Sequence, residues 1–309
     1  MNTRAFRQVD VFTDRAYFGN PLAVVLDGSN LSDAQMQRFA HWTNLSETTF
    51  VLPPTDAAAD YRVRIFTPGG ELPFAGHPTL GTCHAWLAAG GKPRTASRIV
   101  QQCAQGLVPL RRDGERLAFA APPSKRTAPS PTALAQVANA LGLKASQIVA
   151  AQSLDNGPVW LSLLVDDPQT VLRLAPDHAV LKSLGYKIGV AAVSPDANDT
   201  GATPQLIARK NREAGAFARN PAAAPAVSAA LTVRAFAAPS GIIEDPVTGS
   251  LNASLAQWLI EDGYLPASYV ATQGAALGRE GFVHIDRDGD GQVWVGGSSV
   301  ICIEGQVNL

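Results

Sequence analysis

Two short segments of the sequence combine an ionisable residue with proline and glycine, and each directly precedes a run that reads as a helix. "GHPTLG" at 76–81 contains His77, and "EDPVTGS" at 244–250 contains Asp245. Proline is well tolerated at the first helical position, and it moves the residue before it away from helical angles. We therefore expect His77 and Asp245 at or beside helix N-caps, where the positive end of the helix dipole favours anions.

The two segments belong to a longer internal repeat, because residues 61–91 and 231–263 share one pattern. Each reads as a strand ending in a "VRxF" motif, a turn with glycine or proline, a Pro-x-x-Gly-(Thr/Ser) motif and a helix that ends in glycine. The alignment has a constant offset of 168 residues and pairs His77 with Asp245, Pro78 with Pro246, Gly81 with Gly249, and Thr82 with Ser250.

If the two halves face each other, two helix N-termini converge on one cleft. The free backbone N–H groups there would bind a carboxylate substrate. The expected substrate-binding residues are Gly76, Gly81, Thr82, Gly249 and Ser250.

Glu47 is the third ionisable residue of interest, in "NLSETTFVLPP" at the start of a predicted strand, next to Ser46, which is also expected to bind the substrate. The second half has no acid at the matching strand entry, so the cleft would contain a single natural proton carrier. One acid/base group can remove a proton from one carbon and return it to another. Taken alone, each of these residues also has a structural explanation: Glu47 as a solvated residue at a strand end, and His77 and Asp245 as ordinary helix caps. The pairing of His77 with Asp245 in matching glycine-rich motifs argues instead for a function.

Composition sets the broad class of the protein. The chain has 309 residues, a net charge of −1, 17% charged and 46% hydrophobic residues. These values are typical of a globular protein and give no sign of nucleic-acid or membrane binding, so a small molecule is the expected partner.

The length favours two domains, and the Pro- and Ser-rich segment 121–132 has the composition of a linker between them. We predict domains at 1–124 and 125–309, and leave open whether the last strand returns to the first domain.

The cysteines and the ends of the sequence bear on location and metals. Cys83, Cys103 and Cys302 are odd in number and have no C-x-x-C spacing, so neither a disulfide framework nor a metal site is predicted. The first residues contain no apolar run of signal-peptide length. A cytoplasmic protein is therefore expected, without a metal.

The remaining pattern predicts alternating strands and helices. The predicted helices cover 32–44, 78–89, 132–141 and 176–184, and "DRDGDG" at 286–291 is predicted to be a hairpin turn in place of a calcium loop. Residues 195–229 show no firm periodicity, and we expect them to form an excursion or an insertion.

Taken together, these motifs resemble the PhzF-like isomerase family of phenazine biosynthesis. The resemblance covers nearly the whole chain and includes "VDVFTDRAYFGNPLAVVLDG", "NLSETTFVLPP" and "FAAPSGIIEDPVTGSLNASLAQWL". It implies an α+β fold like that of diaminopimelate epimerase. In that fold two pseudo-symmetric domains, each a curled, mostly antiparallel sheet around a central helix, enclose the active site between them.

The resemblance also implies a reaction. In the family the matching glutamate is the proton shuttle and the matching His and Asp assist, which implies these catalytic roles for Glu47, His77 and Asp245. It further implies an isomerase that needs no cofactor and forms a homodimer. In the thiol-dependent racemases of the same fold, cysteines occupy roughly the positions of His77 and Asp245. An amino-acid racemase or epimerase, and a non-catalytic small-molecule binder, are the alternatives.

Overall fold

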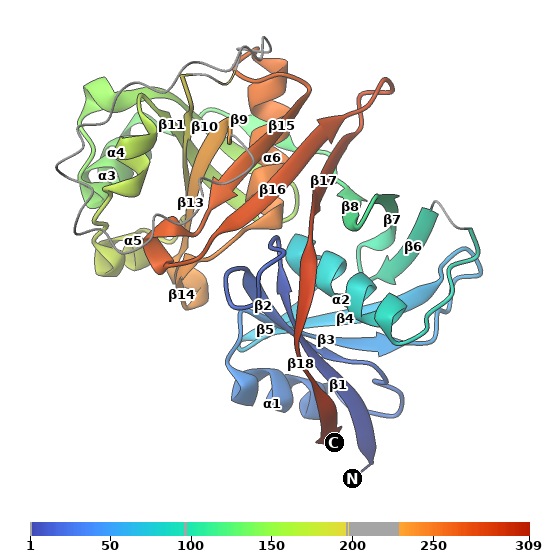
Figure 1. Cartoon of the computed structure of the whole chain (residues 1–309). Helices are drawn as coiled ribbons and strands as arrows, with labels where there is room; N and C mark the ends of the chain where they lie inside the picture. Colours follow the sequence, from blue (N-terminus) through green and yellow to red (C-terminus); the bar gives the residue numbers. More distant parts are fainter. Residues whose placement is uncertain (1, 96–97, 196, 198–228) are drawn as a thin grey trace, which may run out of the picture.

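The computed structural model describes residues 2–95, 98–195, 197 and 229–309. The segment 195–229, singled out for its lack of periodicity, falls almost entirely outside these residues. In Figure 1 the N-terminal and C-terminal elements form two neighbouring groups of strands, each built around one helix.

The N-terminal group surrounds helix α2 (Figure 1). Its elements are β1 (Thr3–Val11), β2 (Asn20–Val25), α1 (Asp33–Thr43), β3 (Glu47–Leu52), β4 (Tyr61–Thr67), β5 (Gly70–Leu72), α2 (Gly76–Ala88), β6 (Arg98–Cys103), β7 (Gly106–Asp113) and β8 (Arg116–Ala120). Strand side chains alternate between two faces. One face packs on α2, and the other packs on α1 through Val25, Phe50 and Phe66.

The C-terminal group surrounds helix α6 in the same manner. Its elements are β9 (Lys125–Thr127), α3 (Pro131–Leu141), β10 (Ile148–Asp155), β11 (Val159–Val165), α4 (Pro168–Leu172), α5 (His178–Leu184), β12 (Lys187–Val193), β13 (Leu231–Ala237), β14 (Ile242–Asp245), α6 (Gly249–Glu261), β15 (Ser268–Gln273), β16 (Gly281–Arg287) and β17 (Val293–Gly297). The strand that follows, β18 (Ser299–Asn308), instead runs beside β1 in the N-terminal group (Figure 1). Helices α3, α4 and α5 cover the sheet face that points away from α6.

Helices α2 and α6 are the two central helices. Each has 13 residues, and nine of them are buried, on all sides of the helix. A helix that is apolar all round must be surrounded by other elements, which the curled strands provide. Most strand pairings in the described chain are antiparallel, the exceptions being β2–β3, β4–β6, β11–β12 and β13–β15. The predicted fold class, with two similar sheet-and-helix units, is confirmed.

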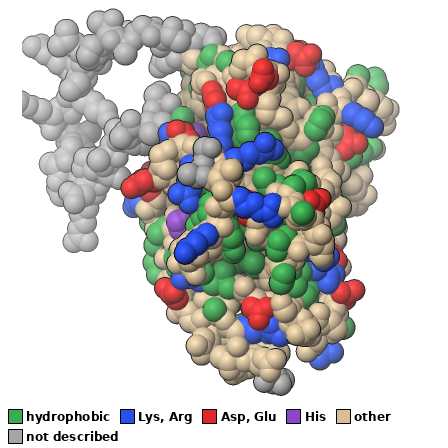
Figure 2. All heavy atoms as spheres, turned by 90° about the vertical axis from the view of Figure 1, so that its right-hand side faces the viewer, with side chains coloured by type: hydrophobic (Ala, Val, Ile, Leu, Met, Phe, Trp, Pro, Cys, Tyr) green, Lys and Arg blue, Asp and Glu red, His purple; other side chains and the backbone are tan. Residues whose placement is uncertain are grey.

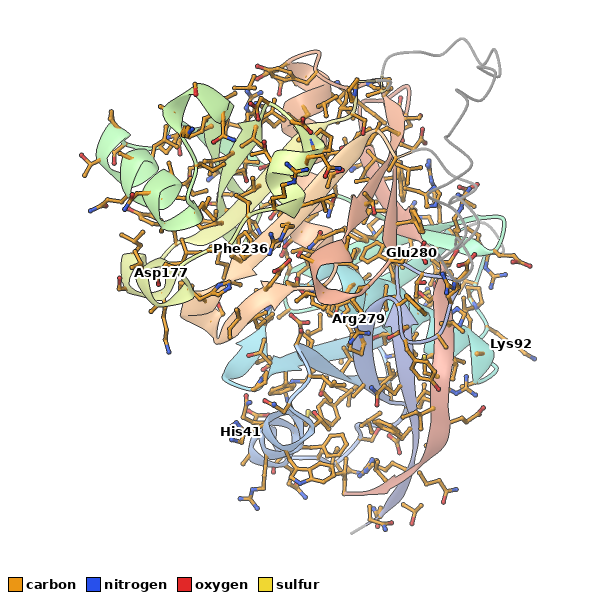
Figure 3. All side chains as sticks on the ribbon, turned by 60° about the vertical axis from the view of Figure 1, so that its left-hand side comes forward. His41, Lys92, Asp177, Phe236, Arg279 and Glu280 are labelled. Carbon is orange, nitrogen blue, oxygen red and sulfur yellow. The ribbon has the colours of Figure 1, made fainter. Side chains whose placement is uncertain are left out.

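The two groups of elements are joined by more than the chain connection. The C-terminal strand β18 pairs antiparallel with β1 along most of its length, and β17 pairs with β8. Arg279 and Glu280, labelled in Figure 3, lie where the groups meet, and Arg279 Nη1 donates to the Tyr17 carbonyl at 2.9 Å. The domain limit at residue 124 stays a prediction.

The expected helix starts need a correction. Helix α2 has Ala75 as its N-cap, which places His77 second in the helix and Pro78 third. Proline is tolerated there because the first four N–H groups of a helix have no intrahelical partner. Asp245 instead ends β14, and α6 begins four residues later at Gly249. The helices therefore correspond with an offset of 173 residues in place of 168.

The other local predictions match the structure closely. Ser32 caps α1 in a reciprocal capping box with Gln35, as expected for a helix over 32–44. The turn at 288–291 joins β16 to β17 as the predicted hairpin. The predicted linker 121–132 is partly structured, because β9 pairs with β10 inside it.

Two surface observations bear on possible partners. Among the described residues, no helix is long and apolar enough to cross a membrane. On the face shown in Figure 2, acidic and basic side chains are interspersed among apolar and neutral ones.

Candidate active site

A cavity of about 340 Å³ lies where the two groups of elements meet. Its ionisable lining residues are Glu47 and His77 from the N-terminal half and Lys187 and Asp245 from the C-terminal half. Gly76, Gly249 and Ser250 line the same cavity. Six of the nine site residues predicted from the sequence are therefore brought together.

Glu47 and His77 face each other across one wall of the cavity. Glu47 is the first residue of β3, which pairs with β2, and His77 is in the first turn of α2. Glu47 Oε2 lies 3.4 Å from His77 Nε2, and the two side chains are only 12% and 4% exposed. Neither atom has a hydrogen-bond partner in the described chain, so each is available to the other or to a ligand.

Burial determines the protonation of this pair. The pKa of Glu47 is raised to about 8. Loss of water on burial is the main cause, the nearby Asp245 carboxylate adds to the rise, and the Lys187 charge opposes it. Burial lowers the pKa of His77 to about 3, with a hydrogen bond to the Pro21 backbone opposing the change. At neutral pH Glu47 therefore holds a proton in most molecules and the His77 ring is uncharged.

Asp245 has a more polar environment. Burial raises its pKa to about 6, while hydrogen bonds from Thr248 and Asn20 oppose the rise. Thr248 Oγ1 donates to Oδ2 at 2.7 Å and Asn20 Nδ2 donates to Oδ1 at 2.8 Å. Hydrogen bonds to the charged form favour that form, so Asp245 is ionised at neutral pH while Glu47 stays protonated.

The N-termini of α2 and α6 meet at the cavity through two glycines. A Cβ atom added to Gly249 would lie 3.0 Å from the Gly76 Cα and 3.1 Å from the His77 backbone nitrogen. No side chain caps either helix. The free N–H groups at the two helix N-termini therefore lie together at the cavity, and the dipoles of both helices favour an anion there.

Lys187 and Trp160 form the wall next to Ser250. They are register partners on β12 and β11, with the Lys187 Nζ 5.9 Å from the centre of the indole ring. Trp160 Nε1 donates to Ser250 Oγ at 3.2 Å, which ties this wall to the start of α6. No carboxylate of the described residues lies within ion-pair distance of Lys187, so its charge faces the cavity.

Three predicted residues do not line the cavity. Gly81 and Thr82 lie in the second turn of α2, where N–H groups are already bonded within the helix. Gly81 packs against Leu22 and Val11, and the Thr82 hydroxyl donates to Thr49. Ser46 precedes β3 and is absent from the lining. These three residues therefore lie outside the cavity lining, and for Gly81 and Thr82 the reason is that α2 begins at Gly76, two residues before the predicted start.

Asn20 was not singled out from the sequence, although it lies at the centre of the site's hydrogen bonds. It donates to Asp245 and to the Val247 carbonyl, and it is fully buried. A signal was present: Asn20, His77 and Asp245 are each followed directly by proline.

Comparison with known proteins decides the family. The model of the family described as "Phenazine biosynthesis-like protein" matches residues 9–305. The chain belongs to this family. "Antisense-enhancing sequence 1" of Schizosaccharomyces pombe is 34% identical over 99% of both chains. "Trans-2,3-dihydro-3-hydroxyanthranilate isomerase" of Pseudomonas aeruginosa is 32% identical and covers 97% of this chain and 98% of its own.

A solved structure extends the likeness to the fold of this family member. The PhzF-family phenazine biosynthesis protein of Bacillus anthracis has a TM-score of 0.78 at 22% identity, with both chains fully covered. The predicted recognition of the PhzF-like family is therefore confirmed, and with it the assignment of the protein as an isomerase.

Proposed function

We propose that this isomerase moves a proton within a small carboxylate substrate, with Glu47 as the group that takes and returns the proton. The observation that carries the proposal is the isolation of Glu47 Oε2 and His77 Nε2, two buried atoms 3.4 Å apart in the lining of one cavity. A buried, unpartnered polar atom is costly, and a functional role explains why it is retained.

The raised pKa of Glu47 suits both halves of the reaction. A general acid/base works best when its pKa lies near the operating pH, and about 8 is close to neutrality. In the ionised form Glu47 would remove a proton from a carbon, and the C–H bonding electrons would enter the conjugated system of the substrate. The same Glu47 O–H would then protonate a second carbon, so that no proton is gained or lost.

The helix N-termini would hold the substrate while this happens. The free N–H groups of α2 and α6 meet at Gly76 and Gly249, and a carboxylate is the group that such a place favours. Preorganised donors of this kind stabilise charge without rearrangement as the reaction proceeds. The ionised Asp245 would accept a hydrogen bond from a substrate hydroxyl or amino group.

Proton exchange tests the proposal. The protein would be incubated in D₂O with small unsaturated carboxylates, beginning with trans-2,3-dihydro-3-hydroxyanthranilate, the compound named for the Pseudomonas relative. Deuterium entry into the substrate would be followed by NMR. Glu47→Gln should abolish exchange and keep binding, whereas Glu115→Gln, at an exposed turn, should change neither. Exchange that persists in Glu47→Gln would remove Glu47 from the mechanism.

The same experiment separates the alternatives. A racemase or epimerase would exchange deuterium at one carbon with inversion, and a non-catalytic binder would show binding without exchange. No cysteine is among the described residues that line the cavity, which does not favour a two-thiol racemase. Cofactor independence, the homodimer and the cytoplasmic location stay predictions from the sequence.

A further inference from the structure

Strand β12 in the C-terminal half corresponds to strand β3 in the N-terminal half. The two "VRxF" motifs of the repeat end at Phe66 and Phe236. Phe66 pairs with the second residue of β3, and Phe236 pairs with the second residue of β12. The first residues of these strands are Glu47 and Lys187, and each also faces a residue of a parallel neighbouring strand. The repeat therefore has a lysine at the position where its other copy has the proposed proton carrier.

The Lys187 side chain points to the inner face of its sheet, where apolar residues are expected. Register partners on neighbouring strands share a face, and side chains alternate along each strand. Trp160, the register partner of Lys187, and Ala191, on the same face of β12, belong to the core that includes α6. Ile188 packs on the opposite face with α3, α4 and α5. Lysine is rarely found on a core face, so its presence here calls for an explanation.

Two structural explanations for an inward lysine do not apply to Lys187. An inward charge can protect the edge of a sheet, but β12 is paired on both sides, with β11 and β13. An inward charge is usually paired, but none of the ion pairs among the described residues includes Lys187. Its Nζ lies 5.9 Å from the centre of the Trp160 ring, and the residue lines the cavity. The charge is therefore available to a ligand there.

The charges around the cavity indicate what this ligand should carry. Lys187 is the only lysine or arginine among the described residues that line the cavity, and His77 is uncharged at neutral pH. Asp245 is ionised, and Glu47 must lose its own proton before it can take one from a substrate. A substrate carboxylate would then lie beside two carboxylates of the chain. Each helix N-terminus supplies only about half a positive charge, so Lys187 provides the one full positive charge of the described lining.

We propose that Lys187 selects an anionic substrate by binding its carboxylate between the lysine ammonium and the N-terminus of α6. Trp160 connects these two groups, because its ring lies beside Lys187 and its Nε1 donates to Ser250 in the first turn of α6. A carboxylate bound there is held by the C-terminal half, while Glu47 acts on the rest of the molecule from the N-terminal half. The two copies of the repeat thus use one position for different tasks, proton transfer in one and charge recognition in the other. This role adds a binding residue to the proposed function and rests on it for the substrate.

Binding of a charged and a neutral form of one small molecule tests the proposal. Anthranilate and its uncharged amide, 2-aminobenzamide, differ only at the carboxylate, and each would be titrated into the protein by calorimetry at pH 7. The wild-type protein should bind anthranilate about tenfold more tightly than the amide, or better. Lys187→Met should lose this preference and bind the amide as the wild-type protein does, which also shows that the variant is folded. Lys187→Arg should keep the preference because it keeps the charge.

A control and a second variant complete the experiment. Lys182→Met removes an exposed lysine from helix α5 and should change neither affinity. Lys187→Gln supplies another uncharged side chain in case Lys187→Met does not fold. Equal binding of the two compounds by the wild-type protein, or binding of neither, would overturn the proposal, and so would a carboxylate preference that survives in the uncharged variants.

The result also separates this proposal from the proposed function. Deuterium exchange in the wild-type protein, together with a carboxylate preference that does not depend on Lys187, would count against the role of Lys187 alone. A preference that depends on Lys187, without deuterium exchange into any substrate tested, would count against the proposed function alone.

Discussion

The unusual proton affinity of Glu47 makes a prediction about stability that needs no substrate. The native protein holds the Glu47 proton up to a pH of about 8, whereas an unfolded chain loses it near the ordinary value of 4.5. Between these values the native state binds more protons than the unfolded state. The free energy of unfolding must therefore fall as the pH rises through this window.

The size of the effect follows from the two pKa values. Each unit of pKa difference is worth about 1.36 kcal/mol, so from pH 5 to pH 8 the wild-type protein should lose roughly 3 to 4 kcal/mol through Glu47. Glu47→Gln does not titrate and should not show this loss. His77 and Asp245 titrate in both proteins, so the difference between the two proteins reports Glu47 together with its charge interaction with Asp245.

Urea unfolding at several pH values between 5 and 8 measures the difference. The free energy of unfolding of Glu47→Gln should increase steadily relative to that of the wild-type protein as the pH rises, and most of this increase should come above pH 5. Glu115→Gln serves as the matched control, because it also removes one carboxylate but from an exposed turn. Parallel curves for the wild-type protein and Glu47→Gln would refute a proton held by burial at this site.

Two further predictions concern the other cavity walls. Lys187→Met keeps the length of the side chain but removes a charge that lowers the pKa of Glu47. The rising limb of the pH profile of kcat/KM should therefore move to higher pH, and Lys187→Arg should restore its position. A limb that does not move would show that Lys187 does not act on Glu47. Gly249→Ala would place a Cβ against backbone atoms of α2 and should cost about 1–3 kcal/mol of unfolding free energy in urea. Gly289→Ala has open space at its Cβ position and should be nearly neutral, and equal stability of the two variants would count against the contact of the helix ends.

The sequence predicted the positions of the helices better than it predicted the register between the two halves of the repeat. Ser32 and Gln35 form a local cap, so helix α1 could be placed from a few neighbouring residues. The motif "GHPTLG" marked the start of α2 to within two residues. The register of the repeat was wrong because proline suits several positions in a first helical turn, and sequence alone does not select among them.

The meeting of Glu47, His77 and Asp245 in one cavity was predictable, but the residue that connects Asp245 to the N-terminal half was not. Glu47, His77 and Asp245 stood out by residue type and by family resemblance. Asn20 contacts Asp245 across 225 residues of sequence, and no local pattern reports such a contact. Protonation was equally hidden, because it depends on how much water the folded chain removes from each group.

The pairing of β18 with β1 determines when the N-terminal sheet can finish folding during synthesis. During synthesis β1 leaves the ribosome before the other described strands, but its partner on one side begins only at Ser299. Until then one long edge of the N-terminal sheet has open backbone groups that can pair with other chains. Native folding of the half that carries Glu47 and His77 is thus completed only after β18, the last of the described strands, has emerged, so a ribosome that stalls before residue 299 would leave both residues in an unfinished sheet.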